Sequence, residues 1–292
     1  MLVLGGAAVA AAVILIGARS SHDGRMFVKK PWFLVWLVLI AAQGSLWAVS
    51  APVFAGSWLR LRERFGIDRE VWIASAAFAG AVAALFASFA FWGIVPKLDL
   101  NSPLPGHPYR IGALTALGAG VGLIGVQAIT LVHRAAADRS GPLKSGLERF
   151  LFLRDELQTV LFFLGTMIGA ATLASGALRI ALIEDQRTTA HAFPAAAVLA
   201  YGAYFTLLLV AVYAPAYAAL LALGRHLRDE ICGALPEKPE DPSAWAEWQS
   251  QRATVEGFLQ LNVSAGDRLK TGLAIVAPFA GSAISLLLGT GT

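Results

Sequence analysis

The chain has 292 residues, of which 57% are hydrophobic and only 14% are charged, and its mean hydropathy is +0.64. A soluble domain carries about a quarter charged residues, so this composition excludes an ordinary soluble protein. The net charge of +4 is therefore best explained by basic loops at a membrane surface, and we expect no nucleic-acid partner. The single cysteine, Cys232, excludes a disulfide within the chain.

Seven apolar segments are long enough to cross a bilayer, which takes about 20 helical residues. They cover 2–18, 31–59, 71–95, 111–133, 157–183, 193–223 and 271–290. Every Asp and Glu, and every Lys and Arg except Arg179, lies outside these segments. We therefore predict an all-α, polytopic transmembrane bundle of one domain, with the lipid bilayer as its main partner. The first segment is longer than the apolar part of a signal peptide and no basic residue precedes it, so we treat it as a span.

The fourth segment contains GAGVGLIG (118–125), which matches the Gly-x-Gly-x-x-Gly pattern of dinucleotide-binding proteins. That pattern indicates nucleotide binding only between a strand and a helix, with an acidic residue about 20 positions later. Here both flanks are one continuous apolar run, so we expect no nucleotide. Glycines spaced by four residues instead predict a close approach of two helices in a membrane. The glycines for which we predict this packing role are Gly118, Gly122, Gly125, Gly165 and Gly169.

The basic residues indicate an orientation in the membrane. The loops after the second, fourth and sixth segments carry 15 Lys and Arg, and the other three loops carry 7. Because basic loops are enriched on the cytoplasmic side, we predict a cytoplasmic N-terminus in a multi-pass protein of a bacterial-type plasma membrane. The four basic residues in 19–30 would then lie outside, which favours the opposite orientation.

Two segments of the chain resemble each other. AVSAPVFA (48–55) and AVYAPAYA (211–218) share five of eight residues when they are aligned on Pro52 and Pro215. We predict a parallel 3+1+3 pseudo-repeat, in which two three-helix units are joined by the fourth span. Parallel repeats occur in transporters, where the substrate site lies at the repeat interface. Alanine-rich helices also match one another by chance, so a chain without a repeat remains the alternative.

Three prolines, Pro52, Pro215 and Pro278, interrupt predicted spans. Each removes one helical hydrogen bond and frees a carbonyl four residues earlier. Such a carbonyl lines a wet cavity or finds a partner on a neighbouring helix. The prolines therefore indicate either a hinge beside a pathway or ordinary kinks.

Few polar side chains lie within the spans. We interpret a subset of them as lining a pathway: Gln43, Ser50, Gln127, Thr130, Tyr213 and Tyr217. Hydrogen bonds between helices explain the same residues equally well. Arg179 is the one intramembrane charge, and it either serves a function or extends to the interface beside Glu184 and Asp185. The lack of a carboxylate within the spans argues against coupling to protons.

The longest loop, 224–270, has a helical pattern of its own. Leucine and isoleucine recur every four residues from Leu223 to Leu235, which extends the sixth span into the cytoplasm. Ser243 is placed to cap a second helix, which carries Trp248, Val255, Phe258 and Leu259 largely on one face. We predict a cytoplasmic helical hairpin that packs on its own bundle or binds a protein partner through 224–262. The segment 143–156 is also amphipathic, and we expect it to lie in the membrane interface.

The sequence shows little chemistry. The histidines His22, His107, His133, His191 and His226 are scattered, and HExxH, GxSxG, Walker A and CxxC patterns are missing from the sequence. We therefore predict no catalytic residue, no metal and no cofactor, and a protein that is not an enzyme.

These observations favour a membrane transport protein, a channel or passive facilitator for an ion or small solute. We expect it to be a homo-oligomer or to have a membrane partner. The alternative is a non-transporting anchor, relay or effector that acts through 224–270. A transporter predicts a water-accessible cavity that reaches the midplane between the second, fourth and sixth spans. A relay predicts a dry bundle and an exposed apolar face on the hairpin.

Overall fold

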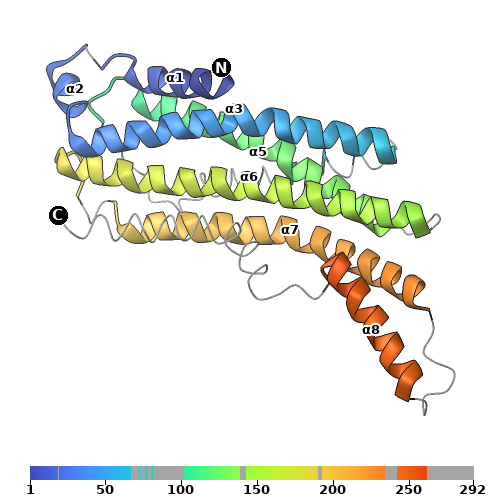
Figure 1. Ribbon diagram of the computed structural model, residues 1–292. Coiled ribbons are helices and arrows are strands. Elements are labelled where there is room, and N and C mark those ends of the chain that lie inside the picture. The colour runs from blue at the N-terminus through green and yellow to red at the C-terminus, as the bar shows by residue number, and fades with distance from the viewer. Residues whose placement is uncertain are drawn as a thin grey trace.

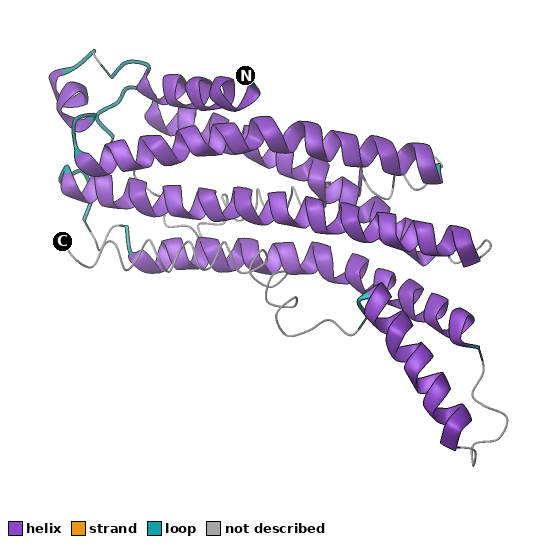
Figure 2. Cartoon of the chain, in the orientation of Figure 1, coloured by secondary structure: helices purple, strands orange, loops and turns teal. Residues whose placement is uncertain are grey.

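A computed structural model of the chain describes residues 1–66 except Arg19, isolated positions between 73 and 84, and residues 102–138, 143–189, 193–233 and 242–261. Within these residues all the regular structure is helical (Figure 2). Four helices are long and apolar enough to cross a membrane: α3 (Pro31–Phe65), α5 (His107–Ala137), α6 (Leu143–Glu184) and α7 (Ala195–Cys232). The other described helices are α1 (Leu2–Leu15), α2 (His22–Phe27) and α8 (Pro242–Leu259).

The four long helices correspond to the predicted spans 31–59, 111–133, 157–183 and 193–223. The predicted span 271–290, with Pro278, lies outside the described residues, and so does nearly all of 71–95. The count of seven spans and the 3+1+3 pseudo-repeat therefore stay predictions.

The helices form one elongated bundle (Figure 1). α3, α5 and α7 run in one direction, and α1 and α6 run in the opposite direction. α5 and α6 each pack against both α3 and α7. We call the end at which α3, α5 and α7 terminate and α6 begins the basic end; it lies at the right of Figure 1.

Large apolar side chains face outward along the bundle. In water such a surface would favour aggregation, whereas in a bilayer it is the surface that lipid solvates. The bundle is therefore a membrane protein. Its exposed large apolar residues include Leu34, Val38, Leu117, Phe162, Leu207 and Val210.

α1 is shorter than the predicted span 2–18. It has 14 residues, about 21 Å of helix, which does not cross a hydrocarbon core of about 30 Å. The chain turns at Gly17, whose φ is +74°. The Arg110 guanidinium donates hydrogen bonds to the carbonyls of Val13, Ile14 and Ile16 at this end. A side chain from α5 thus satisfies carbonyls that a longer helix would have satisfied itself.

α1 and α3 touch through their backbones. A methyl group on Gly6 would overlap the carbonyl of Gly44, and a methyl group on Gly44 would overlap the carbonyl of Gly6. The Ser45 hydroxyl also donates to the Val3 carbonyl at 2.9 Å. Sequence reasoning did not single out this pair of glycines, although the physical basis is the one expected for α5 and α6.

The predicted packing glycines have different surroundings. A methyl group on Gly118 would lie 3.0 Å from the Trp47 ring, and one on Gly125 would lie 3.1 Å from the Phe54 ring. Gly122 has more room, with its nearest neighbour at 3.9 Å from such a methyl. Gly165 and Gly169 are buried on α6.

The segment 143–156 is the first part of α6 and not a separate helix in the interface. Its apolar stripe continues without a break into the membrane segment, because Phe150, Leu153 and Leu157 are all buried. Phe150 meets Gly224 of α7, so this part of α6 packs against the bundle beyond the apolar layer.

The hairpin of α7 and α8 is present. α7 continues to Cys232, and α8 begins at Pro242, so Ser243 lies in the first turn of α8 and does not precede it. The end of α8 packs on the bundle through the buried Leu259 and through an ion pair of 2.9 Å between Arg228 and Glu256. α8 leaves α7 obliquely, and its first turns lie farthest from the bundle (Figure 1).

A buried carboxylate lies near the basic end. Both oxygens of Glu156 accept hydrogen bonds from Arg60, at 2.7 and 3.0 Å. The Glu156 side chain is 8% exposed and that of Arg60 is 52% exposed. Glu156 directly precedes the predicted span 157–183, so it lies outside the predicted spans and is nevertheless buried. The fork of two charge-assisted hydrogen bonds connects α3 to α6.

We expect Gly6→Leu to destabilise the protein by about 1–3 kcal/mol, because overpacking forces two backbones apart. Gly5 is the control, since a methyl group there meets nothing within 4 Å. Thermal unfolding in detergent measures both variants. Equal stabilities of Gly6→Leu and Gly5→Leu would contradict the contact between α1 and α3.

We expect Glu156→Ala to cost about 2 kcal/mol, since it leaves the guanidinium of Arg60 without its fork and a buried gap beside α3. Glu148→Ala is the matched control. Its carboxylate is 57% exposed and lies 3.9 Å from Arg64, an arrangement worth about 0–1 kcal/mol. The same unfolding assay compares the two, and a loss no larger for Glu156 than for Glu148 would count against the buried fork.

Candidate functional site

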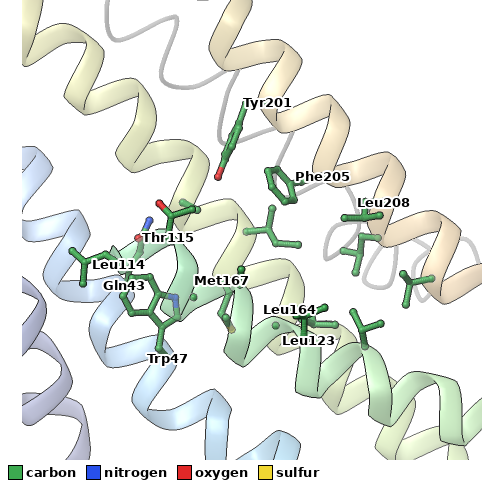
Figure 3. A pocket seen from close by; sticks show the side chains of 18 of the residues that line it. Gln43, Trp47, Leu114, Thr115, Leu123, Leu164, Met167, Tyr201, Phe205 and Leu208 are labelled. Atoms are coloured by element: carbon green, nitrogen blue, oxygen red, sulfur yellow. The ribbon is translucent and has the colours of Figure 1, made fainter. Parts of the chain in front are cut away.

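A cavity of about 210 Å³ lies between α3, α5, α6 and α7 (Figure 3). Most of its lining is hydrocarbon. The described lining residues are Ile40, Gln43, Trp47, Ile111, Leu114, Thr115, Gly118, Ala119, Gly122, Leu123, Val126, Leu164, Met167, Ile168, Ala171, Tyr201, Phe205, Leu208, Leu209 and Val212.

The cavity lies at mid-depth in the membrane. On α6 the apolar stretch is bounded by Glu156 at one end and by Arg179 at the other. This stretch is about 33 Å long at 1.5 Å per residue, which is close to the thickness of a hydrocarbon core. Met167, in the cavity wall, lies midway between the two charged residues.

Small residues on α5 make room for the cavity. Gly118, Ala119 and Gly122 lie on the same part of this helix and all line the space. The Trp47 ring of α3 lies over Gly118. On the opposite side, Tyr201 and Phe205 come from α7 (Figure 3). The cavity therefore lies between α3 and α7 over a stretch of α5 where three small residues stand between larger ones.

Polar groups are few in the cavity wall, and they are uncharged. They are the Gln43 amide, the Trp47 indole N–H, and the hydroxyls of Thr115 and Tyr201. Gln43 is only 5% exposed. Among the described lining residues there is no Asp, Glu, Lys, Arg or His.

Arg179, the predicted intramembrane charge, lies outside this wall. It is 9% exposed, and its Nε donates to the Phe193 carbonyl at 2.7 Å. Asp185, one of its predicted neighbours, pairs with Arg187, which also binds Asp23 at 2.8 Å. The hydrogen bond and the charge of Arg187 hold the pKa of Asp23 below its ordinary value. Arg179 thus lies at the end of the apolar stretch of α6, where it bonds the backbone of Phe193 shortly before α7 begins.

One of the six predicted pathway residues, Gln43, lines the cavity. Ser50 is fully buried on α3, and Gln127 is half-buried on α5. Thr130 donates to the Val126 carbonyl at 2.9 Å. Tyr213 and Tyr217 stack on each other, with ring centroids 5.4 Å apart. The structure therefore does not bring the six together in one lining.

Of the three prolines predicted to interrupt spans, the two that the structure describes lie inside continuous helices, Pro52 in α3 and Pro215 in α7. The Pro215 carbonyl accepts a hydrogen bond from Nδ1 of His133 at 3.1 Å. A side chain of α5 is therefore hydrogen-bonded to the backbone of α7 at its proline. Neither proline is among the described residues that line the cavity.

Sequence reasoning did not assign a site role to Trp47, Thr115 and Tyr201. A signal for each of them exists. Thr115 lies three residues before Gly118, and Trp47 lies four residues after Gln43, so each shares a helix face with a residue that the sequence did single out. The local signal for Tyr201 is its polarity within the predicted span 193–223, but which polar residue of that span faces the cavity depends on where α7 lies.

The described residues offer no metal site, because no three His, Cys, Asp or Glu side chains among them gather closely enough to hold an ion. Comparison of the chain with protein families, with curated proteins and with solved structures finds no match.

Proposed function

We propose that the protein is a passive membrane facilitator that moves a small uncharged solute by way of the mid-depth cavity. The observation that carries this proposal is a cavity at the centre of the apolar layer, between α3, α5 and α7, whose described wall has hydrogen-bonding groups but no charge. An ion entering a cavity with such a wall would lose its hydration water, and no opposite charge in the described wall would compensate for that loss. An uncharged solute can exchange water for the amide and hydroxyl groups.

The state of the buried acid supports a passive mechanism. A proton-coupled carrier uses a membrane carboxylate that gains and loses a proton. Both oxygens of Glu156 accept hydrogen bonds from Arg60, and Glu156 is not among the described residues that line the cavity. The proposal therefore includes no proton relay and no catalytic step.

The charges support an orientation with the basic end in the cytoplasm. The opposite end carries fewer described basic residues, namely Arg25, Lys29, Lys30, Arg110, Arg179 and Arg187. The described Lys and Arg at the basic end are Arg60, Arg62, Arg64, Arg134, Lys144, Arg149, Arg154, Arg225, Arg228 and Arg252.

Flux into liposomes tests the proposal, with neutral solutes of graded size and with Na⁺, K⁺ and Cl⁻. We expect the wild type to accelerate entry of a neutral solute, and Ala119→Phe to lower that rate about tenfold, because a ring fills a cavity of this size. Ala116→Phe is the control on the same helix, since residue 116 is exposed and does not line the cavity.

Two results would contradict this function. The first is ion flux that is as fast in Ala119→Phe as in Ala116→Phe. The second is silence for every solute from reconstituted protein whose helix content and unfolding match those of the protein in detergent.

A second candidate, a relay or effector that acts through 224–270, is favoured by the surface of α8. Phe258 is 59% exposed, and the rings of Trp245 and Trp248 stack with centroids 5.3 Å apart. An effect of the protein that is lost in Phe258→Ser and kept in Ala119→Phe would support the hairpin. The reverse pattern would support the cavity.

A further inference from the structure

The polar groups of the cavity gather toward one end. Gln43, Thr115 and Tyr201 all line the cavity, and the Tyr201 hydroxyl points into it from α7 (Figure 3). Toward the basic end the wall is hydrocarbon, contributed by residues such as Leu123, Leu209 and Val212. The cavity thus has a polar end and an apolar end.

The hydrogen-bonding capacity of the polar end is unused within the described part of the chain. Thr130, Thr166 and Thr206 each donate to the carbonyl four residues earlier. No such bond is formed by Thr115, and no described residue bonds the Gln43 amide. The Gln43 side chain borders the cavity, and Thr115 is exposed there. A ligand that supplies both a donor and an acceptor can therefore bond the amide and the hydroxyl together.

We propose that the cavity binds a neutral amphiphile, with a head that both donates and accepts hydrogen bonds, such as a primary amide, and a short unbranched hydrocarbon chain. The head bonds Gln43 and Thr115, and the chain extends along Leu164 and Val212. The inference rests on the proposed function, since this ligand is the solute that the facilitator moves.

The size of the cavity and the lack of charge in its described wall limit the class of ligand. A protein cavity of about 150 Å³ holds a benzene molecule, so 210 Å³ accommodates about eight non-hydrogen atoms by the same scale. A carboxylate head would need a cation, and the described wall has none. The nearby Arg179 is occupied by the Phe193 carbonyl.

Binding of radiolabelled hexanamide to the full chain in nanodiscs, measured by scintillation proximity against empty nanodiscs, tests the inference. We expect saturable binding by the wild type. Gln43→Leu should weaken it about tenfold, which corresponds to about 1.4 kcal/mol. Gln127→Leu is the matched control, because Gln127 is outside the cavity wall, and it should change binding less than about twofold.

Competition separates the possible occupants. We expect hexanamide to compete at least about tenfold better than heptane or hexanoate. Equal competition by heptane, or equal binding by Gln43→Leu and Gln127→Leu, would show an apolar cavity that a lipid acyl chain fills, and would overturn the proposal. Stronger competition by hexanoate than by hexanamide would contradict the inference that the head of the ligand is uncharged.

The assay is independent of transport. If hexanamide binds in a way that depends on its amide head but no solute crosses the membrane, the ligand site is supported and the proposed transport function is contradicted. If a neutral solute crosses the membrane but hexanamide shows no saturable binding to protein with the helix content of the wild type, the transport function is supported and the ligand class is contradicted.

Discussion

The hydrocarbon core of a bilayer offers no hydrogen-bond partner to a peptide group, so every backbone group within it needs a partner inside the protein. The long helices meet this requirement by their own hydrogen bonds. α1 ends before it could cross, and its last carbonyls are bonded by the guanidinium of Arg110. Near Pro215, the imidazole of His133 bonds the backbone of α7. Two side chains of α5 thus bond the backbone of neighbouring helices, Arg110 at the end of α1 and His133 at Pro215 of α7.

The same solvent determines how the helices pack. Lipid is as apolar as leucine, so burial of leucine gives little reason for two helices to associate. Close contact provides dispersion energy instead, and it requires small residues. Gly6 and Gly44 bring α1 and α3 together, and Gly118 receives the Trp47 ring. Where α5 has small residues and no large side chain fills the space, the bundle contains a cavity. The same pattern of small residues thus produces close helix packing where a neighbouring side chain or backbone fills the space, and a cavity where nothing fills it.

Much of the fold was predictable from the sequence, because hydrophobic length and the placement of charges are local properties. Four predicted spans correspond to α3, α5, α6 and α7, and the hairpin of α7 and α8 follows from the stripe at Leu223 and Leu227. The end of α1 was not predictable, since Arg110 lies far along the chain from the carbonyls it bonds. The burial of Glu156 likewise depends on Arg60, a residue of another helix.

The site was predictable only in part. Polarity within a span identifies Gln43, but it identifies Ser50 and Tyr213 equally, and only the packing of four helices decides which polar groups face a common space. Thr115 and Tyr201 line the same cavity as Gln43 because α5 and α7 present those turns to the same level of α3 (Figure 3). Such a coincidence between distant segments has no signature in one sequence.

The length of α6 has a structural consequence. The helix has 42 residues and no proline, so its hydrogen-bond ladder runs unbroken from the basic end to the far side of the membrane. Phe150 touches Gly224 of α7, one turn before the residue that pairs with α8, and Met167, about 25 Å along the same helix, is part of the cavity wall. One continuous helix therefore joins the region where α8 is anchored to the wall of the cavity at mid-depth in the bilayer.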